Sequence, residues 1–565
     1  MLTLKDIQFT PPGADTPLLS GISARYPAGH LGAIVGPSGC GKSTLLKVIA
    51  GILPQYDGNI FWHGRSLEEQ DLPAHELGYV PQFSCIQPFL TVQENLSYTA
   101  RLRRGDTSRA MTELVGKTLE ETGLGDLRNR RAGVLSGGQL RRLALAMELT
   151  TQPDLLLADE VTSGLDPKSE EEITQLLSHL ARIEGRVVLL VTHSLRFLDS
   201  YDSVTVLYGG RLTYSADPRL LTNYFQVANP DQIYPALTES EPAFWSEEWL
   251  NSVEPEVLTP LHMIHEVESK IHLADKQSHL LLPGYISQTT TWLSRRIKLF
   301  LRDPAQVFLQ LSLLLIFPAV VTLFAYRGLP SVRNMAMSSD LGIVDQLRET
   351  LAFTAQSSRI GTLVSGLAMF QVILLALMAS NNSAREVVAQ RDILEKEKLA
   401  GLRPTAVLSG MVLFLSVLVF LQAAWMTLFV RAICQFPGSV PLQFLPFLAL
   451  SGAVTAMCLA ISSWAKTSEQ SSLGSLYLVG FQLPLSGALL ALPDFLGWIT
   501  RPLISGYWAW SAYLQTLRDT RFYDLVSSIT ETPLANYPVS IWILMIHLGL
   551  GLVLSLFGIT RSRWP

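Results

Sequence analysis

Charged residues are scarce in this chain. Only 16% of its 565 residues are Asp, Glu, Lys or Arg, whereas 48% are hydrophobic, and the net charge is −5. So little charge in a protein of this size predicts that part of the chain lies in lipid. The small negative net charge argues against a broad surface for nucleic acid. The composition therefore predicts a membrane protein that does not bind nucleic acid.

Cysteine is scarcer still. Cys40, Cys85, Cys434 and Cys458 lie far apart in the sequence, in a spacing that fits neither a disulfide framework nor a zinc ligand set. This usage is typical of a reducing cytoplasm and a bilayer. The N-terminal segment MLTLKDIQF lacks a basic start followed by an apolar core, so we expect no cleavable signal peptide. We therefore expect the first domain to remain in the cytosol.

The apolar residues are distributed unevenly along the chain. Residues 1–225 alternate short β-like runs with charged helical stretches, which predicts an α/β domain. Residues 226–290 are polar and proline-rich, which predicts a linker with some helix. For residues 291–565 we expect an all-α domain with six membrane spans, because six apolar runs are long enough to cross a bilayer: 305–326, 360–380, 406–430, 443–464, 472–492 and 540–560.

Basic residues between these runs set the expected orientation. Threading six spans brings the following basic residues to one side of the membrane: Arg295, Arg296, Lys298, Arg302, Arg385, Arg391, Lys396, Lys398, Arg403, Lys466, Arg561 and Arg563. That side also carries the N-terminal domain. We expect a multi-pass protein of the plasma (inner) membrane whose N-terminal domain and both termini are cytoplasmic.

A glycine-rich loop, GPSGCGKST, follows the apolar run LGAIV. Its glycines leave backbone N–H groups free for phosphate oxygens, Lys42 can reach the β and γ phosphates, and Ser43 can ligate Mg²⁺. A helix expected from about Ser43 to Ala50 directs its positive end at the anion. The alternative is an ordinary glycine-rich turn. The predicted phosphate site comprises Gly36, Pro37, Ser38, Gly39, Cys40, Gly41, Lys42, Ser43 and Thr44.

Two acidic residues follow a predicted strand, Leu155–Ala158, in the segment DLLLADE. Asp159 can hold Mg²⁺ directly or through water. Glu160 can orient or deprotonate an attacking water. In isolation such a pair is often just two solvated acids. Its position after the glycine-rich loop favours the metal and water roles.

A second candidate anion site lies in VLSGGQLRRLALAMEL. Ser136 is expected to cap a helix over 140–150, and Gly137 and Gly138 expose backbone amides at its positive end. Two phosphate sites far apart in one chain make sense if each completes the other's nucleotide across a dimer. These motifs, in this order, resemble those of the ATP-binding cassette (ABC) family.

The resemblance implies an ABC nucleotide-binding domain over 1–225, with its helical subdomain, and ATP and Mg²⁺ as cofactors. GPSGCGKST would be the Walker A loop, LSGGQ the signature, LLLADE the Walker B strand and SGLD the D-loop that ends at Asp166. The catalytic residues would be Glu160, His193 in LLVTHS and Gln82 in GYVPQ, and the metal ligands Ser43, Gln82 and Asp159. Nucleotide contacts would also come from Ser136, Gly137, Gly138, Gln139 and Asp166.

His193 has an alternative interpretation, and one feature of the family is not found at its usual position. Taken alone, a histidine after an apolar strand, such as His193, is more often packed in a core. The family usually stacks adenine on an aromatic residue ahead of the Walker A loop, where this chain has Pro11. Phe9 and Tyr26 are nearby but poorly placed in the sequence, so the adenine-stacking residue stays unassigned.

The order of an ATPase domain followed by a membrane domain resembles the G subfamily of ABC half-transporters. VANPDQI (227–233), RRIKLFLRDP (295–304) and LGWITRPLISGYWAWSAYL (496–514) resemble segments of that group. The charged stretch 384–404 resembles its cytoplasmic loop between the second and third spans. The amphipathic pattern of this stretch predicts a coupling helix on the ATPase domain near the Gln82 loop. A merely solvated loop is the alternative.

The predicted spans contain few polar groups, namely Gln371, Gln422, Gln482 and His547, and none has an acid or a lysine at its centre. This argues against proton coupling and against a strongly charged substrate. The resemblance makes Gln371 and Gln482 candidates for a substrate cavity, with interhelical hydrogen bonds as the alternative.

Together these features predict an ATP-driven half-transporter in contact with membrane lipid. It would pair with a second copy or a related half-transporter and export a hydrophobic or amphipathic, lipid-like substrate. The alternative is an ATPase-bearing regulatory or gating subunit that moves nothing itself.

Overall fold

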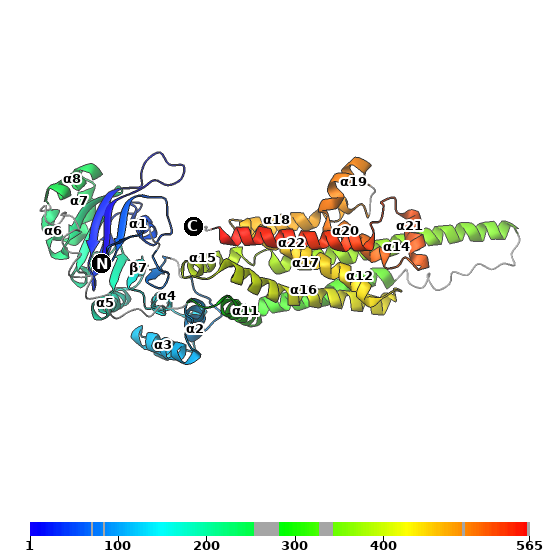
Figure 1. Ribbon diagram of the computed structural model, residues 1–565, viewed down its shortest axis with the longest axis horizontal. Helices are drawn as coiled ribbons and strands as arrows, with labels where there is room; N and C mark the ends of the chain where they lie inside the picture. Colours follow the sequence, from blue (N-terminus) through cyan, green and yellow to red (C-terminus); the bar gives the residue numbers. More distant parts are fainter. Residues whose placement is uncertain (69–71, 83–84, 253–281, 327–342, 489–491, 562–565) are drawn as a thin grey trace. The chain divides into compact units, whose positions relative to one another are not determined.

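The computed structural model describes residues 1–68, 72–82, 85–252, 282–326, 343–488 and 492–561. The chain forms two compact units. The first comprises Met1–Thr291 together with Glu395–Leu402, and the second comprises Trp292–Leu394 together with Arg403–Arg563. Figure 1 follows the chain from blue to red through its helices and strands. Each unit is described by itself below.

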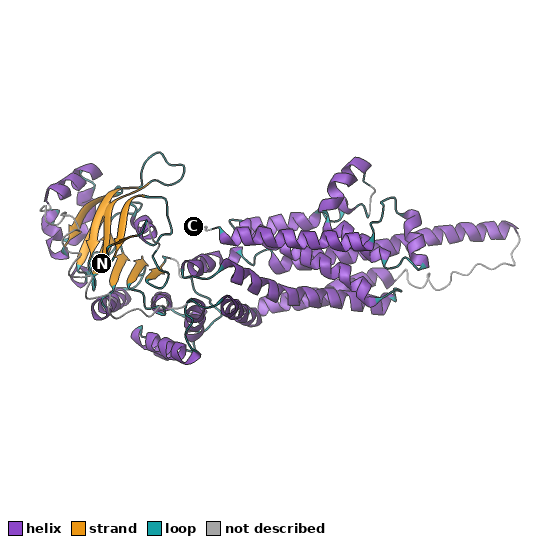
Figure 2. Cartoon of the chain, in the orientation of Figure 1, coloured by secondary structure: helices purple, strands orange, loops and turns teal. Residues whose placement is uncertain are grey.

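The first unit contains two β-sheets, drawn in orange in Figure 2. An antiparallel sheet has the order β2-β1-β4-β5, with β1 (Leu2–Phe9), β2 (Leu19–Tyr26), β4 (Asp57–Trp62) and β5 (Arg65–Ser66). A second sheet has the order β10-β9-β3-β8-β7-β6, with β3 (Leu31–Val35), β6 (Leu77–Val80), β7 (Leu155–Asp159), β8 (Val187–Val191), β9 (Ser203–Tyr208) and β10 (Arg211–Ala216). Strands β6, β7, β8, β3 and β9 are parallel, and β10 is antiparallel to β9. The central strands are buried on both faces because their sequences are continuous apolar runs.

Helices surround these sheets, and two of them lie within a few residues of helices that the sequence predicts. The helix predicted near residues 43–50 is α1, and the helix predicted over 140–150 is α4, which starts at Gly137 with Ser136 as its N-cap. The α-helices of this unit are α1 (Lys42–Ile49), α2 (Val92–Arg103), α3 (Ser108–Glu121), α4 (Gly137–Leu149), α5 (Pro167–Glu184), α6 (Leu221–Tyr224), α7 (Ile233–Leu237) and α8 (Pro242–Ser252). The α/β class expected for this part of the chain is confirmed.

The compact part of the first unit extends beyond the predicted boundary at residue 225. Helix α8 packs on β10, where the Trp249 ring lies 5.1 Å from the Tyr214 ring and the Trp245 ring lies 5.2 Å from that of Phe225. Trp245 and Trp249 are one helical turn apart, so both rings reach one surface. The composition of the predicted linker 226–290 is polar and proline-rich, and it gives no indication that Trp245 and Trp249 pack on the domain. Residues 253–281 of that predicted linker lie outside the described residues.

The second unit is helical. Helix α11 (Tyr285–Arg302) leads into it, and it contains α12 (Pro304–Tyr326), α14 (Ile343–Ser383), α16 (Pro404–Cys434), α17 (Val440–Trp464), α18 (Ser468–Gly480), α19 (Asp494–Thr500), α20 (Ser505–Gln515), α21 (Arg521–Ile529) and α22 (Tyr537–Thr560). Helix α15 (Arg391–Leu399) joins α14 to α16 along the chain. Among the described residues, α12, α14, α16, α17 and α22 are long and apolar enough to cross a membrane, and they contain five of the six predicted spans.

The other predicted span, 472–492, differs from expectation. Helix α18 has 13 residues and ends at Gly480, and a 3-10 turn at Pro484–Ser486 and a left-handed Gly487 (φ 76°) follow it. Pro484 lacks the N–H that would continue a helix, and glycine adopts the left-handed conformation without strain. Part of the remainder, 489–491, lies outside the described residues. The predicted single span is therefore a short helix followed by an irregular segment, and its crossing of the membrane stays a prediction.

Polar side chains within the second unit bond to one another. Gln310, Asn382 and Gln422, from α12, α14 and α16, form a buried ring of amide hydrogen bonds of 2.8–3.0 Å. Gln482 accepts from the backbone N–H of Gly506 at 2.7 Å. The His547 ring lies 2.8 Å from the Ser505 hydroxyl. These side chains therefore make hydrogen bonds between helices, which is the alternative that the sequence analysis gives to a substrate cavity.

Candidate nucleotide-binding site

The glycine-rich loop connects β3 to α1. Gly39 (φ 81°) and Gly41 (φ 97°) are left-handed, and a Cβ atom on Gly41 would lie 2.5 Å from Cδ2 of Leu19. This backbone therefore requires glycine at residue 41. The Lys42 ammonium donates to the carbonyl oxygens of Gly36 (2.9 Å) and Pro37 (2.8 Å), which places its charge over the loop. The loop and the start of α1 have the form of an anion site.

A hydroxyl and a carboxylate meet beside this loop. The Ser43 hydroxyl, in the first turn of α1, donates to Oδ1 of Asp159 at 2.8 Å, at the end of β7. Burial raises the pKa of Asp159, the hydrogen bond from Ser43 opposes this rise, and the negative charge of Glu160 adds to it. These oxygen ligands fit Mg²⁺, which proteins usually hold through one or two carboxylates together with substrate phosphates and water. Among the described residues, no cluster of three or more His, Cys, Asp or Glu suited to a metal ion occurs.

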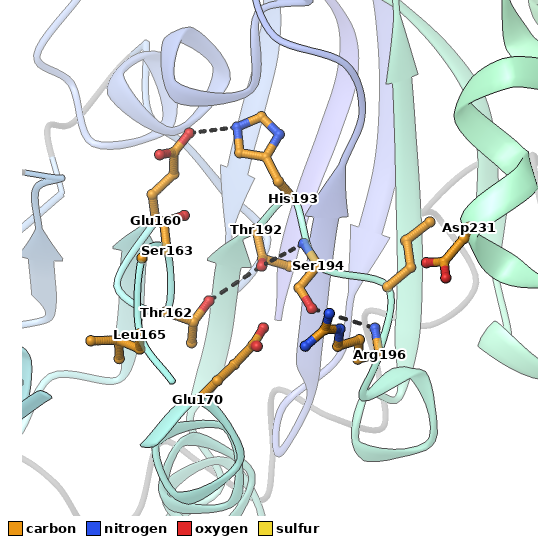
Figure 3. Close-up of a pocket in the computed structure, with 12 residues that line it drawn as sticks. Glu160, Thr162, Ser163, Leu165, Glu170, Thr192, His193, Ser194, Arg196 and Asp231 are labelled. Atoms are coloured by element: carbon orange, nitrogen blue, oxygen red, sulfur yellow. Dashed lines mark hydrogen bonds and ion pairs between the residues drawn. The ribbon is translucent and has the colours of Figure 1, made fainter. Parts of the chain in front are cut away.

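The Glu160 carboxylate lies between two hydrogen-bond donors. Its Oε2 accepts from Nε2 of Gln82 at 2.8 Å, and its Oε1 lies 2.8 Å from Nε2 of His193 (Figure 3). A carboxylate only accepts, so the His193 ring carries its hydrogen on Nε2. Glu160 has a left-handed backbone (φ 50°), a conformation that costs about 1–3 kcal/mol for a residue other than glycine. The three predicted catalytic residues thus form one chain of hydrogen bonds beside Asp159 and Ser43.

The signature segment forms a separate helix start. The Ser136 hydroxyl accepts from the backbone N–H of Gln139 (3.4 Å), and the Gln139 side chain accepts from the backbone N–H of Ser136 (3.1 Å). This capping box leaves the amides at the start of α4 directed outward. A Cβ atom on Gly138 would lie 3.3 Å from the Ser169 hydroxyl. Asp166 caps α5 and accepts from this hydroxyl at 2.6 Å, so the D-loop aspartate adjoins the signature within one chain.

A cavity of about 470 Å³ opens next to the Glu160–His193 pair (Figure 3). Its wall comes from the D-loop, the loop after β8 and the segment that precedes α7. The lining residues are Glu160, Thr162, Ser163, Gly164, Leu165, Glu170, Thr192, His193, Ser194, Leu195, Arg196 and Asp231.

The structure adds site residues that sequence reasoning missed. Tyr79 on β6 donates a hydrogen bond to Asp159. The Arg141 guanidinium, on α4, donates to the carbonyl oxygen of Gln82. Tyr79 is the third residue of the buried strand β6 and Arg141 lies inside α4, and neither position gives a local sequence signal. Phe9 (6% exposed) and Tyr26 (0% exposed) are buried in the core, so neither has a free face for adenine.

Comparison with known proteins shows two family matches. The ABC transporter family matches residues 19–163, and the ABC-2 type transporter family matches residues 287–517. The chain is 30% identical over 517 residues to the "ABC transporter ATP-binding/permease protein Rv1747" of Mycobacterium tuberculosis, covering 88% of this chain and 56% of that protein. It is 27% identical over 532 residues to "ABC transporter G family member 5" of Arabidopsis thaliana, covering 89% of this chain and 78% of that protein.

A further relative matches a shorter part of the chain. The "Probable multidrug ABC transporter ATP-binding protein YbhF" of Escherichia coli is 36% identical over 223 residues, which is 39% of this chain and 38% of that protein. The chain thus spans about half or less of the first curated relatives that it matches. The ABC-2 match and the five apolar helices indicate an integral membrane protein.

Proposed function

Because the chain belongs to the ABC transporter family, with its ATP-binding domain ahead of an ABC-2 type membrane domain, we propose that it hydrolyses ATP to drive transport across a membrane. It acts as a half-transporter in a dimer, with the ATP-binding domain and both termini in the cytoplasm. Its substrate is a hydrophobic or amphipathic, lipid-like molecule that it exports.

One observation carries the ATPase proposal. Glu160 is held between Gln82 and His193, immediately after the Asp159 carboxylate that bonds to Ser43. In this arrangement Glu160 orients the attacking water and takes its proton. Lys42 binds the β and γ phosphates, and His193 binds the γ phosphate. Ser43, Gln82 and Asp159 would hold Mg²⁺, which would supply positive charge beside the phosphates.

The dimer proposal rests on the second helix start. Ser136 and Gln139 bond to each other in a capping box, and among the described residues no hydrogen bond joins them to the glycine-rich loop of the same chain. In a two-fold dimer, the α4 start of one chain would close the nucleotide held by Lys42 of its partner.

Mixed dimers of inactivated chains test this arrangement. A tandem-purified dimer of a Lys42→Ala chain and a Ser136→Arg chain is expected to keep about half of the wild-type ATPase rate, because both changes strike the same composite site and spare the other. A wild-type chain paired with a Lys42→Ala/Ser136→Arg chain is expected to be inactive, since both of its sites carry one change. Phosphate release from each preparation is the measurement. The reverse pattern would place each complete site within a single chain.

Helix α4 also connects the site to the charged stretch that the sequence predicts as a coupling helix. Within the first unit, Lys396 Nζ lies 2.7 Å from Glu148 Oε1 near the end of α4. The Gln288 amide bonds to the carbonyl oxygens of Leu102 (3.4 Å) and Gly401 (3.0 Å). These buried contacts support the coupling helix over a solvated loop. We propose that it passes movement of α4 to α16, which begins directly after it in the chain.

Reconstitution into liposomes tests the transport proposal. Vesicles with wild-type protein and MgATP outside are expected to move labelled lipids or hydrophobic dyes from a panel, and vesicles with Glu160→Gln are not. The exposed-surface variant Glu171→Gln serves as the matched control and is expected to transport like wild type. Vesicles that hydrolyse ATP but move no member of the panel would favour the regulatory or gating subunit.

A further inference from the structure

Tyr234, on the short helix α7, contacts the backbone of the proposed nucleotide site. The Tyr234 hydroxyl donates to the backbone carbonyl oxygen of His193 at 3.2 Å. The Tyr234 hydroxyl oxygen in turn accepts a hydrogen bond from the backbone N–H of Gly36, the first residue of the glycine-rich loop. A single phenol group therefore joins the two loops that are proposed to hold the γ phosphate. The ATP-binding family match ends at residue 163 and does not include Tyr234.

Helix α7 is fixed firmly enough to hold this phenol in place. Ile233 and Leu237 are both 0% exposed and belong to the core on one face of the parallel sheet. The indole N–H of Trp245, on α8, donates to the Leu237 carbonyl oxygen at 3.2 Å. The end of α7 is thus bonded to the helix that packs on β10. The position of Tyr234 therefore depends on the packing of α7 in this core and on its bond to α8.

The protonation state of Tyr234 suits a donor. Burial raises its pKa to about 12, although the Gly36 hydrogen bond lowers it. The hydroxyl consequently keeps its proton at any physiological pH and can donate to the His193 carbonyl while it accepts from Gly36. His193 is then held at two points, by Tyr234 at its backbone and by Glu160 at its ring.

We propose that Tyr234 is a positioning residue for ATP hydrolysis, whose hydroxyl sets the distance between His193 and the glycine-rich loop. This inference rests on the proposed function, because it takes the roles of His193 and Glu160 as given. Loss of the hydroxyl frees the His193 carbonyl and the Gly36 amide, so that the histidine is less often aligned with the γ phosphate. A small misplacement of a positioned group lowers the rate of the chemical step more than it lowers the affinity for the nucleotide.

Tyr234→Phe in the full-length protein tests the proposal. The kcat for ATP is expected to fall about 3- to 10-fold while KM changes less than about twofold, because alignment and not nucleotide binding is impaired. The matched control is Tyr224→Phe. The Tyr224 hydroxyl is buried without a hydrogen-bond partner in the described part of the chain, and its ring lies 5.2 Å from that of Tyr214. Removing this hydroxyl is expected to leave kcat unchanged.

A double-mutant cycle separates positioning from a general structural effect. In a His193→Ala background, Tyr234→Phe is expected to cause no further loss of kcat, because the hydroxyl acts through His193. A wild-type kcat for Tyr234→Phe, or an equal loss with and without His193, overturns the inference and leaves the proposed function standing. By contrast, full hydrolysis by Glu160→Gln would overturn the proposed function and this inference with it.

Discussion

Glu160→Gln is expected to lower ATP hydrolysis by about 100-fold or more, because an amide cannot take the proton of the attacking water. The substitution keeps the size of the side chain. The Asp159–Ser43 pair and the Lys42 ammonium are separate contacts, so binding of MgATP is expected to remain close to wild type. Phosphate release and binding of a fluorescent ATP analogue, measured on the same reconstituted sample, check the two parts of this prediction.

The substitution Glu160→Gln also affects the hydrogen bonds of this side chain. Both of its oxygens face N–H donors, from Gln82 and His193, so a glutamine side chain must turn its own NH₂ group toward one of them. The amide keeps both bonds when its NH₂ group faces His193 and the imidazole carries its hydrogen on Nδ1, so the substitution removes the base and changes the His193 tautomer. Glu171→Gln, at an exposed position of α5, removes a carboxylate without touching the site and is expected to hydrolyse ATP normally. Rapid hydrolysis by Glu160→Gln would assign the base to another residue.

Local sequence predicted the parts of the site that depend on local geometry. The glycine-rich loop requires left-handed residues, and the sequence has glycine at Gly39 and Gly41, where these occur. The start of α4 could be predicted because Ser136 and Gln139 form a capping box within one turn. Likewise, the buried strand before Asp159 could be recognised as a continuous apolar run.

The remaining features depend on packing between distant segments. Nothing near Arg141 or Tyr79 in the sequence indicates a bond to Gln82 or Asp159, since those contacts arise only when α4, β6 and β7 assemble. Similarly, Trp245 and Trp249 lie in a stretch whose composition resembles a linker, although they pack on β10. The end of α18 at Gly480 was missed because an apolar run predicts burial in lipid but not where a helix ends.

The buried ion cluster at the end of α4 is the feature with the greatest expected effect outside the nucleotide site. Glu148 bonds to Arg103 at 2.9 Å and to Lys396 at 2.7 Å, and all three side chains are at most 5% exposed. Burial by itself would raise the pKa of Glu148, but the two cations lower it to about 2. Glu148 therefore stays ionised at neutral pH. Its contribution to stability is present above its ordinary pKa and is lost as the pH falls toward 2.

Lys396→Glu is expected to abolish transport and to lower the thermal unfolding temperature of the reconstituted protein. The change places a second carboxylate beside Glu148 in a site that excludes water, and breaking a buried ion pair costs about 3–5 kcal/mol. Lys168→Glu reverses a charge at an exposed position (84% exposed), so it is expected to leave both properties unchanged.

Lys396→Met distinguishes loss of coupling from loss of fold. It keeps most of the apolar stem of the lysine and removes the charge, so Glu148 retains Arg103 as its partner. This variant is expected to bind ATP and to hydrolyse it at the basal rate. Substrate is expected no longer to stimulate hydrolysis, and the transport rate is expected to fall about 10-fold or more, because α4 no longer contacts the segment that leads into α16. Wild-type transport by both Lys396 variants would mean that 395–402 transmits no movement to the spans, and that coupling runs through another segment.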